Sequence, residues 1–417
     1  MAADLTPDML TTADGRPLKA ALVAAQGAAR RRAFWLVAPL LAFVVITFII
    51  PIGQMLQRSV YHDGFSANAP QVSAWFAATE PGTVPDEAAY AALAADFQAM
   101  KAAKTFGNAA TRVNYTLSET RSLFTATARA ADKLVPPYRE AFLGLDEKWG
   151  SPSVWQAMRS SSTAYTADFY LIAMDYERAE DGGLQKVPDN QRIYLYLFVK
   201  TMLLSALITV SCLLLAFPVA HLLATLPMAR ANLLMILVLL PFWTSLLVRT
   251  TSWIVLLQGQ GVVNEALVAV GAVADQSRLS MMYNQTGTII VMTHILLPFM
   301  ILPLYSVMRV IPPSYARAAR SLGATSWTTF RRIYLPQTLP GIGAGALLVF
   351  ILAVGYYITP ALVGGADGQL ISNLIDFHMD KSNWSLAAAL SAMLLAGVLV
   401  LYWLYDRLIG IDNLKLG

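Results

Sequence analysis

The sequence is poor in cysteine, histidine and phosphate-binding loops, and each shortage removes a class of function. The single cysteine, Cys212, lies within an apolar stretch, so an intrachain disulfide is excluded. The four histidines, His62, His221, His294 and His378, are scattered and match no metal-ligand spacing. A Gly-x-x-x-x-Gly-Lys-Ser/Thr loop is missing. We therefore expect a non-catalytic chain that holds no cofactor of its own.

Charge is also scarce, and the shortage is uneven. Charged residues make up 13% of the 417 residues, hydrophobic residues make up 56%, and the mean hydropathy is +0.52. Residues 57–193 hold 13 Lys+Arg and 16 Asp+Glu, which leaves 17 basic and 10 acidic residues for the rest of the chain. This distribution indicates a membrane protein with one water-soluble insert. The net charge of +4 is then explained by loops on one side of a membrane rather than by nucleic-acid binding.

Six apolar runs are long enough to cross a bilayer. They lie at about 33–55, 195–223, 233–257, 286–311, 340–363 and 386–408. Arg30, Arg31 and Arg32 precede the first run, which is too long and too far from the N-terminus for a signal peptide. We predict an all-α polytopic membrane protein with six transmembrane helices: a cytoplasmic tail (1–29), a first helix (30–56), an insert (57–193) and a five-helix core (194–417). Arginines in alternate loops put both termini in the cytoplasm.

The insert shows three helical patterns. The first begins at Asp86 and Glu87 and continues with an apolar face, made of Tyr90, Leu93, Phe97 and Met100. The second runs over about 109–134, and the third over about 153–177. We expect a small helical subdomain on the periplasmic side. Two roles remain open for it, which are packing support and contact with a soluble binding protein.

The segment 312–337 is basic although apolar sequence flanks it. From Ser314 to Pro336 it carries four arginines and no acidic residue. Its alanines favour a short helix, which Gly323 can end in a left-handed cap. A second short helix is expected over about 326–334, and we expect Pro336 to stop it.

The spacing in this segment resembles the cytoplasmic coupling loop of ABC importer permeases. The pattern of that loop is Ala-Ala, three residues, Gly, nine residues, Ile, one residue and Leu-Pro. Its six fixed positions are matched here by Ala318, Ala319, Gly323, Ile333, Leu335 and Pro336. Arg317 departs from the pattern, because the family usually has glutamate there. The resemblance implies contact with an ATPase subunit through Arg317, Ala318, Ala319, Leu322, Gly323, Ile333, Leu335 and Pro336.

Four further stretches look like the spermidine/putrescine branch of these permeases. They are Phe217–Ala224, Pro241–Thr250, Leu297–Leu304 and Thr359–Gly365. The resemblance implies the type I permease fold and a place in the bacterial inner membrane. It also implies three partners: two copies of a cytoplasmic subunit that binds ATP and Mg²⁺, a second permease subunit (a relative or a copy) and a periplasmic solute-binding protein.

Two groups of residues are candidates for a substrate path. One is Arg249 with Trp243 and Thr244, since an ionisable residue inside a span is costly and tends to be functional. Arg249 could instead pair with a helix end or extend to the interface. The other group is Tyr356, Tyr357 and Thr359, next to a break at Pro360, where aromatic faces suit a cationic amine. Plain helix packing is the alternative for the tyrosines.

The expected function is therefore import of a small cationic or amine-containing, polyamine-like solute. The permeases of this branch tend to have an acidic residue at about Tyr356, so an opine or amino-acid-like substrate is the alternative. A membrane receptor with a sensing insert is an alternative from another functional class, but the tails of 29 and about nine residues offer no signalling domain. A secondary transporter is not favoured, since midplane charges and internal repeats are not visible.

Overall fold

The structure is a computed structural model that describes residues 18–178 and 183–409. Most of the expected N-terminal tail and the last eight residues, 410–417, lie outside the described residues. The chain divides into two compact units, Met1–Gln57 and Arg58–Gly417. Both are helical, and one two-stranded sheet is present within the described part of the chain. The predicted all-α membrane fold is confirmed.

The first unit contains one long apolar helix. It consists of α1 (Leu18–Val44), a π-helical turn η2 (Val45–Ile49) and the start of α2 (Ile50–Val60). Residues Ala29–Val60 qualify as a membrane span. Its apolar side chains are exposed, as they are in a helix that faces lipid, and Leu36 reaches 83% exposure.

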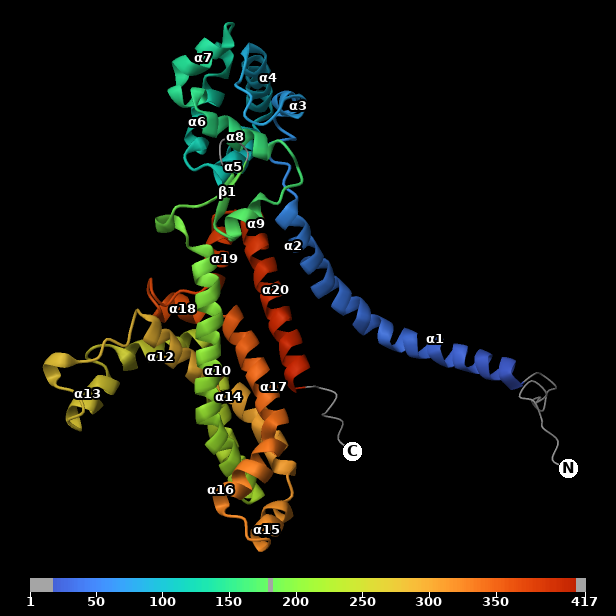
Figure 1. Cartoon of the computed structure of the whole chain (residues 1–417), viewed down its shortest axis with the longest axis vertical. Helices are drawn as coiled ribbons and strands as arrows, with labels where there is room; N and C mark the ends of the chain where they lie inside the picture. Colours follow the sequence, from blue (N-terminus) through green and yellow to red (C-terminus); the bar gives the residue numbers. More distant parts are fainter. Residues whose placement is uncertain (1–17, 179–182, 410–417) are drawn as a thin grey trace. The chain divides into compact units, whose positions relative to one another are not determined.

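The second unit is built on a bundle of long helices (Figure 1). Helices α10 (Tyr194–Thr225), α14 (Gln285–Val310) and α17 (Leu335–Gly355) pack against one another, and α20 (Trp384–Ile409) packs on α17. Cys212, Met300 and Val349 are fully buried between the first three. A Cβ atom added to Gly345 would lie 2.7 Å from Met300 Sδ, so this glycine lets α14 and α17 approach closely.

The expected third span, 233–257, is not one straight helix. It is divided into α11 (Met228–Leu239), a 3₁₀ turn η6 (Leu240–Trp243) and α12 (Leu246–Leu257), followed by α13 (Val262–Ala269). The two halves are bent by 97°. Pro241 cannot donate a backbone hydrogen bond, and Ser245 Oγ accepts the Val248 amide at 3.2 Å, which starts a new helix. The described residues therefore hold five candidate spans and one bent pair.

The insert forms its own helical core above the bundle helices. Its elements are α3 (Pro70–Ala78), α4 (Glu87–Ala103), α5 (Phe106–Thr116), α6 (Thr120–Arg129), η3 (Ala131–Lys133), α7 (Tyr138–Leu145), η4 (Glu147–Gly150), α8 (Pro152–Ser161) and α9 (Asp168–Ala173). Strands β1 (Tyr176–Arg178) and β2 (Leu184–Lys186) and the turn η5 (Asp189–Gln191) follow. The first predicted helix is correct: the Asp86 carboxylate accepts the Ala89 amide at 2.9 Å, and the four expected apolar residues are buried.

The other two insert predictions, single helices over 109–134 and 153–177, are wrong. The first is interrupted after Thr116, where Glu119 takes a left-handed conformation with φ of 74°. The helix predicted over 153–177 ends at Ser161, because serine hydroxyls there bond to the backbone of their own turn. Ser160 and Ser161 both donate to the Ala157 carbonyl, at 2.9 and 2.7 Å. The chain then re-forms α9 and turns into the antiparallel pair β1–β2.

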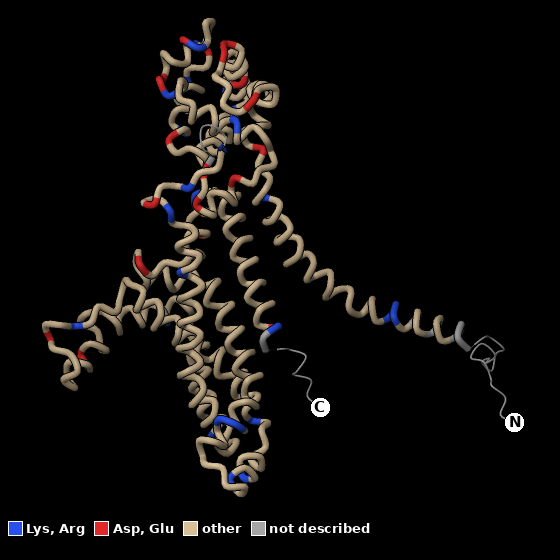
Figure 2. The backbone as a smooth tube through the Cα atoms, in the orientation of Figure 1, with Lys and Arg blue, Asp and Glu red and all other residues tan. Residues whose placement is uncertain are grey.

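A side-chain cap and a helix contact join the insert to the bundle. The Asp175 carboxylate accepts the amides of Ile193, Tyr194 and Leu195 at 2.8–3.2 Å and so caps the start of α10. Helix α9 packs on α20. Helices α15 (Pro313–Ser321) and α16 (Ser326–Thr329) lie at the opposite end of the bundle from the insert, as Figure 1 shows. Figure 2 shows basic residues gathered at that end, whereas acidic residues concentrate in the insert.

Candidate functional site

The basic segment forms a tight helical bend. Helix α15 ends at Ser321, and Gly323 follows with φ of +89°. The Leu322 amide donates to the Ala318 carbonyl at 3.1 Å, and the Ala324 amide donates to Ala319 at 3.0 Å. These bonds form the left-handed cap that the sequence predicts. Thr325 then starts α16 by accepting the Thr328 amide at 3.2 Å.

The predicted stop at Pro336 is wrong. The chain passes from α16 through a π-helical turn, η8 (Phe330–Tyr334), directly into α17, so that Ser326–Gly355 forms one continuous apolar helix. Pro336 follows this π-helical turn, as the second residue of α17. The wider π turn precedes it and accommodates the change of register.

The tip of the bend exposes apolar side chains. Leu322 is 89% exposed, Trp327 67% and Tyr315 52%. An exposed cluster of this kind at the end of a bundle indicates a surface that another protein covers. Sequence reasoning selected Leu322 but missed Trp327 and Tyr315. The signal that could have found them is a pair of large aromatic residues inside a basic loop.

The base of the bend is a cavity of about 560 Å³ between α15 and the ends of α10, α14 and α17. Arg317, Arg320 and Ile333 line it, so the structure brings the two halves of the predicted motif together. The Tyr334 hydroxyl lies 2.8 Å from His221 Nδ1 and ties this region to α10. Arg309 binds the carbonyls of Ala224 and Leu226 at 2.9 and 3.2 Å, which satisfies the C-terminal end of α10.

Arg249 closes the break in the third span. Its guanidinium donates to the carbonyls of Pro241 and Thr244, the latter at 3.1 Å, and lies over the Phe242 ring. The structure thus pairs this arginine with a helix end. Its buried Nε has no hydrogen-bond partner in the structure. Trp243, by contrast, points outward and is 75% exposed.

The tyrosine pair marks a second break. Helix α17 ends at Gly355, and α18 (Ile358–Val363) begins after the two tyrosines, so the interruption precedes Pro360. The Tyr356 and Tyr357 carbonyls accept from Ser372 and Asn373 at 2.6 and 2.7 Å. Thr359 is fully buried, and its hydroxyl has no hydrogen-bond partner in the structure.

The two candidate groups come close to each other within this chain. Helix α18 contacts α12, and Tyr356 packs against the same buried apolar cluster as Leu246 and Trp253 of α12. Trp253 Nε1 donates to His294 Nδ1 at 2.9 Å, so this ring nitrogen of His294 has a hydrogen-bond partner. Within the residues described, no group of three or more His, Cys, Asp or Glu side chains could hold a metal ion.

Comparison with known proteins identifies the family of this chain. A family model described as the inner membrane component of binding-protein-dependent transport systems matches residues 193–409. The chain belongs to this family. The suspected membership of the ABC importer permeases is therefore confirmed, and the chain is a transport subunit of the inner membrane with multiple spans.

Several curated permeases resemble the matched region. The spermidine/putrescine transport system permease protein PotB of Salmonella typhimurium is 37% identical over 222 residues, covering 52% of this chain and 77% of that protein. PotB of Escherichia coli K12 is 36% identical over 222 residues, covering 80% of its length. The inner membrane ABC transporter permease protein YdcU of Escherichia coli K12 is 30% identical over 228 residues, covering 51% of this chain and 71% of that protein.

A solved structure is similar at a lower level. A bacterial alginate ABC transporter, crystallised with an alginate pentasaccharide-bound periplasmic protein, has 20% identity and a TM-score of 0.46. The match covers 54% of this permease and 81% of the alginate transporter chain. The family match begins at residue 193, so the insert, 57–193, lies outside it except for its last residue.

Proposed function

We propose that the permease forms the translocation path of an ABC importer for a small, cationic, polyamine-like solute. The observation that carries this proposal is the 37% identity to a spermidine/putrescine permease over 222 residues, 52% of this chain. The tyrosine pair at the α17–α18 break supplies aromatic faces that suit a protonated amine. An opine or amino-acid-like solute on the same scaffold is the second candidate, because no acidic residue stands at Tyr356.

The coupling role belongs to the bend at α15–α16. We assign the contact with a cytoplasmic ATP-binding subunit to Arg317, Ala318, Ala319, Leu322, Gly323, Ile333, Leu335 and Pro336. Exposed Leu322 and Trp327 support this role, since they need a partner surface. Two copies of that subunit bind ATP and Mg²⁺, a second permease subunit completes the membrane part, and a periplasmic binding protein delivers the solute.

The topology follows from the charge distribution. Basic residues cluster at the α15–α16 end of the second unit, which the positive-inside rule places in the cytoplasm. The insert is then periplasmic and both termini are cytoplasmic. Within the membrane, Trp243, Thr244, Arg249, Tyr356, Tyr357 and Thr359 are the residues proposed to line or support the path. Arg249 acts there by holding the break in the third span.

An uptake assay tests the proposed function. Cells that lack their other polyamine importers and express the complete transporter are given radiolabelled spermidine or putrescine, with unlabelled amino acids and opines as competitors. We expect ATP-dependent amine uptake that other polyamines compete away and amino acids do not. Absence of polyamine uptake, or uptake that an opine or an amino acid abolishes at a lower concentration than unlabelled polyamines do, would reject the polyamine assignment.

A further inference from the structure

The insert contains a cavity that the translocation path does not use. Its volume is about 240 Å³, below the range typical of sites for drug-sized ligands. It is partly open to solvent, and four elements line it: the end of α5, one face of α8, one face of α9 and the β1–β2 pair. Convergence of separate elements on one small concave space is typical of a ligand site.

The chemistry of the walls is one-sided. The charged side chains that line the cavity are Asp168 and Glu177, and both are acidic. Carboxamides from Gln156 and Gln185 and hydroxyls of serine and threonine supply further acceptors. Leu171 and Ile172 add an apolar floor. Acidic groups together with an apolar floor suit an organic cation better than a metal ion, which would need more carboxylate ligands.

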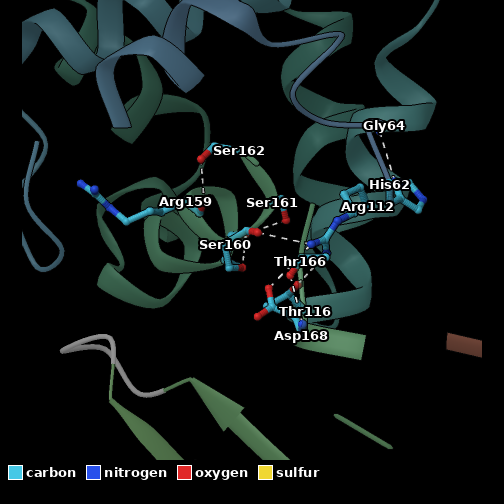
Figure 3. Close-up of polar contacts among 11 residues, drawn as sticks. His62, Gly64, Arg112, Thr116, Arg159, Ser160, Ser161, Ser162, Thr166 and Asp168 are labelled. Carbon is cyan, nitrogen blue, oxygen red and sulfur yellow. Dashed lines mark hydrogen bonds and ion pairs between the residues drawn. The ribbon is translucent and has the colours of Figure 1, made fainter. Parts of the chain in front are cut away.

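One of the two carboxylates is built into the fold. The Asp168 side chain is 7% exposed, and the guanidinium of fully buried Arg112 lies 3.7 Å from it. Arg112 donates to the Thr116 hydroxyl and the Ser160 carbonyl, at 3.1 and 3.3 Å (Figure 3). Arg112 also lies over the Phe169 ring, 4.9 Å from its centre. The carboxylate is thus fixed in position at the cavity wall, and the guanidinium offsets part of its charge. Glu177 is exposed, accepts the Gln185 carboxamide at 3.0 Å and forms no ion pair with a described basic side chain, so it supplies the uncompensated negative charge.

The cavity floor is linked to the transport helices. Leu171 and Ile172 face the cavity from α9, while Phe169 and Ala173 of the same helix pack on the bundle. Their partners there are Ile371 of α19 (Ile371–Asp380) and Leu386 and Leu390 of α20. A ligand in the cavity therefore contacts a helix that is packed directly on two elements of the permease core.

We propose that this cavity binds a small protonated organic amine, with Asp168 and Glu177 as its charge partners. The choice of an amine over other organic cations rests on the proposed function, whereas the negative charge and the size of the site rest on the cavity alone. The insert would then hold a second amine site, outside the membrane path and in contact with α20 through α9.

A charge series in the cavity tests the proposal. The complete transporter is purified in detergent without its binding protein, and equilibrium binding of radiolabelled spermidine and putrescine is measured. Glu177→Gln removes one charge and should weaken binding about three- to tenfold. Gln156→Glu adds a charge to the opposite wall and should tighten binding by a similar factor. Glu140→Gln, an exposed acid on α7 outside the cavity, is the matched control and should change nothing.

The opposite signs expected for the two cavity variants separate binding from damage to the fold, because damage would not tighten binding. Equal binding in Glu177→Gln, Gln156→Glu and Glu140→Gln would overturn the proposed site, even where spermidine uptake by the wild-type transporter is normal. Failure of uptake with intact, Glu177-dependent binding would instead reject the proposed transport function and leave the site standing.

Discussion

At the scale of the residue, the bend between α15 and α16 depends on a backbone angle. Gly323 has φ of +89°, and a Cβ added there would meet nothing within 4 Å. A branched residue would therefore be opposed by backbone strain alone, about 1–3 kcal/mol, and would shift the bend without disturbing the core. We expect Gly323→Val to insert normally and to lower uptake at least several-fold, as measured per molecule in the membrane.

Gly82 supplies the matched control for that variant. It has φ of +83° and also has open space around its Cβ position, but it lies in the α3–α4 loop of the insert. Gly82→Val imposes the same kind of strain away from the bend and should leave uptake near the wild-type level. Equal uptake in the two variants would show that the bend angle does not matter for coupling.

Single residues of the candidate site were predictable to different degrees. Gly323 follows from the sequence because a left-handed cap strongly prefers glycine. For Arg249 the sequence offered a helix end as one possible partner but not its residues, since the carbonyls of Pro241 and Thr244 become available only where the third span breaks. The exposure of Trp327 likewise depends on the π-helical turn that follows it, and residue types in the sequence do not predict such a turn.

At the scale of the element, Asp175 joins the insert to the first core helix. Its carboxylate accepts three amides at the start of α10 and is 5% exposed. Asp175→Ala leaves these amides without a partner and should lower the free energy of unfolding by about 1–3 kcal/mol. Thermal unfolding of the purified protein in detergent measures this. The solvent-exposed Asp189→Ala should shift the unfolding temperature little, and a similar shift in both variants would argue against the cap.

Elements with a sustained apolar period were predicted well, and interrupted ones were not. Helix α4 has both its capping Asp86 and its buried face in the expected places. At Glu119 and after Ser161 the local pattern favours a continuing helix, but the chain turns a packed corner instead. Such breaks are decided by tertiary packing, which overrides weak helix propensity, and short strands such as β1 carry too few residues for a period.

At the scale of the whole molecule, one arrangement connects the proposals. The second unit carries an acidic insert at one end of its helical bundle and a basic bend with exposed apolar side chains at the other. The sequence predicted this polarity because charge, unlike helix breaks, can be counted along the chain. The account therefore requires that the α15–α16 end contact an ATP-binding protein in the cytoplasm and that the insert not contact it.

Site-specific photocrosslinking measures this contact most directly. A photoreactive amino acid replaces Leu322, which is 89% exposed at the bend, or Leu145, which is 42% exposed at the end of α7 in the insert. Irradiation of intact cells followed by mass spectrometry identifies the captured protein. We expect Leu322 to capture a cytoplasmic ATP-binding subunit and Leu145 to capture none of it. Absence of that subunit at Leu322, or its capture at Leu145, would contradict the account.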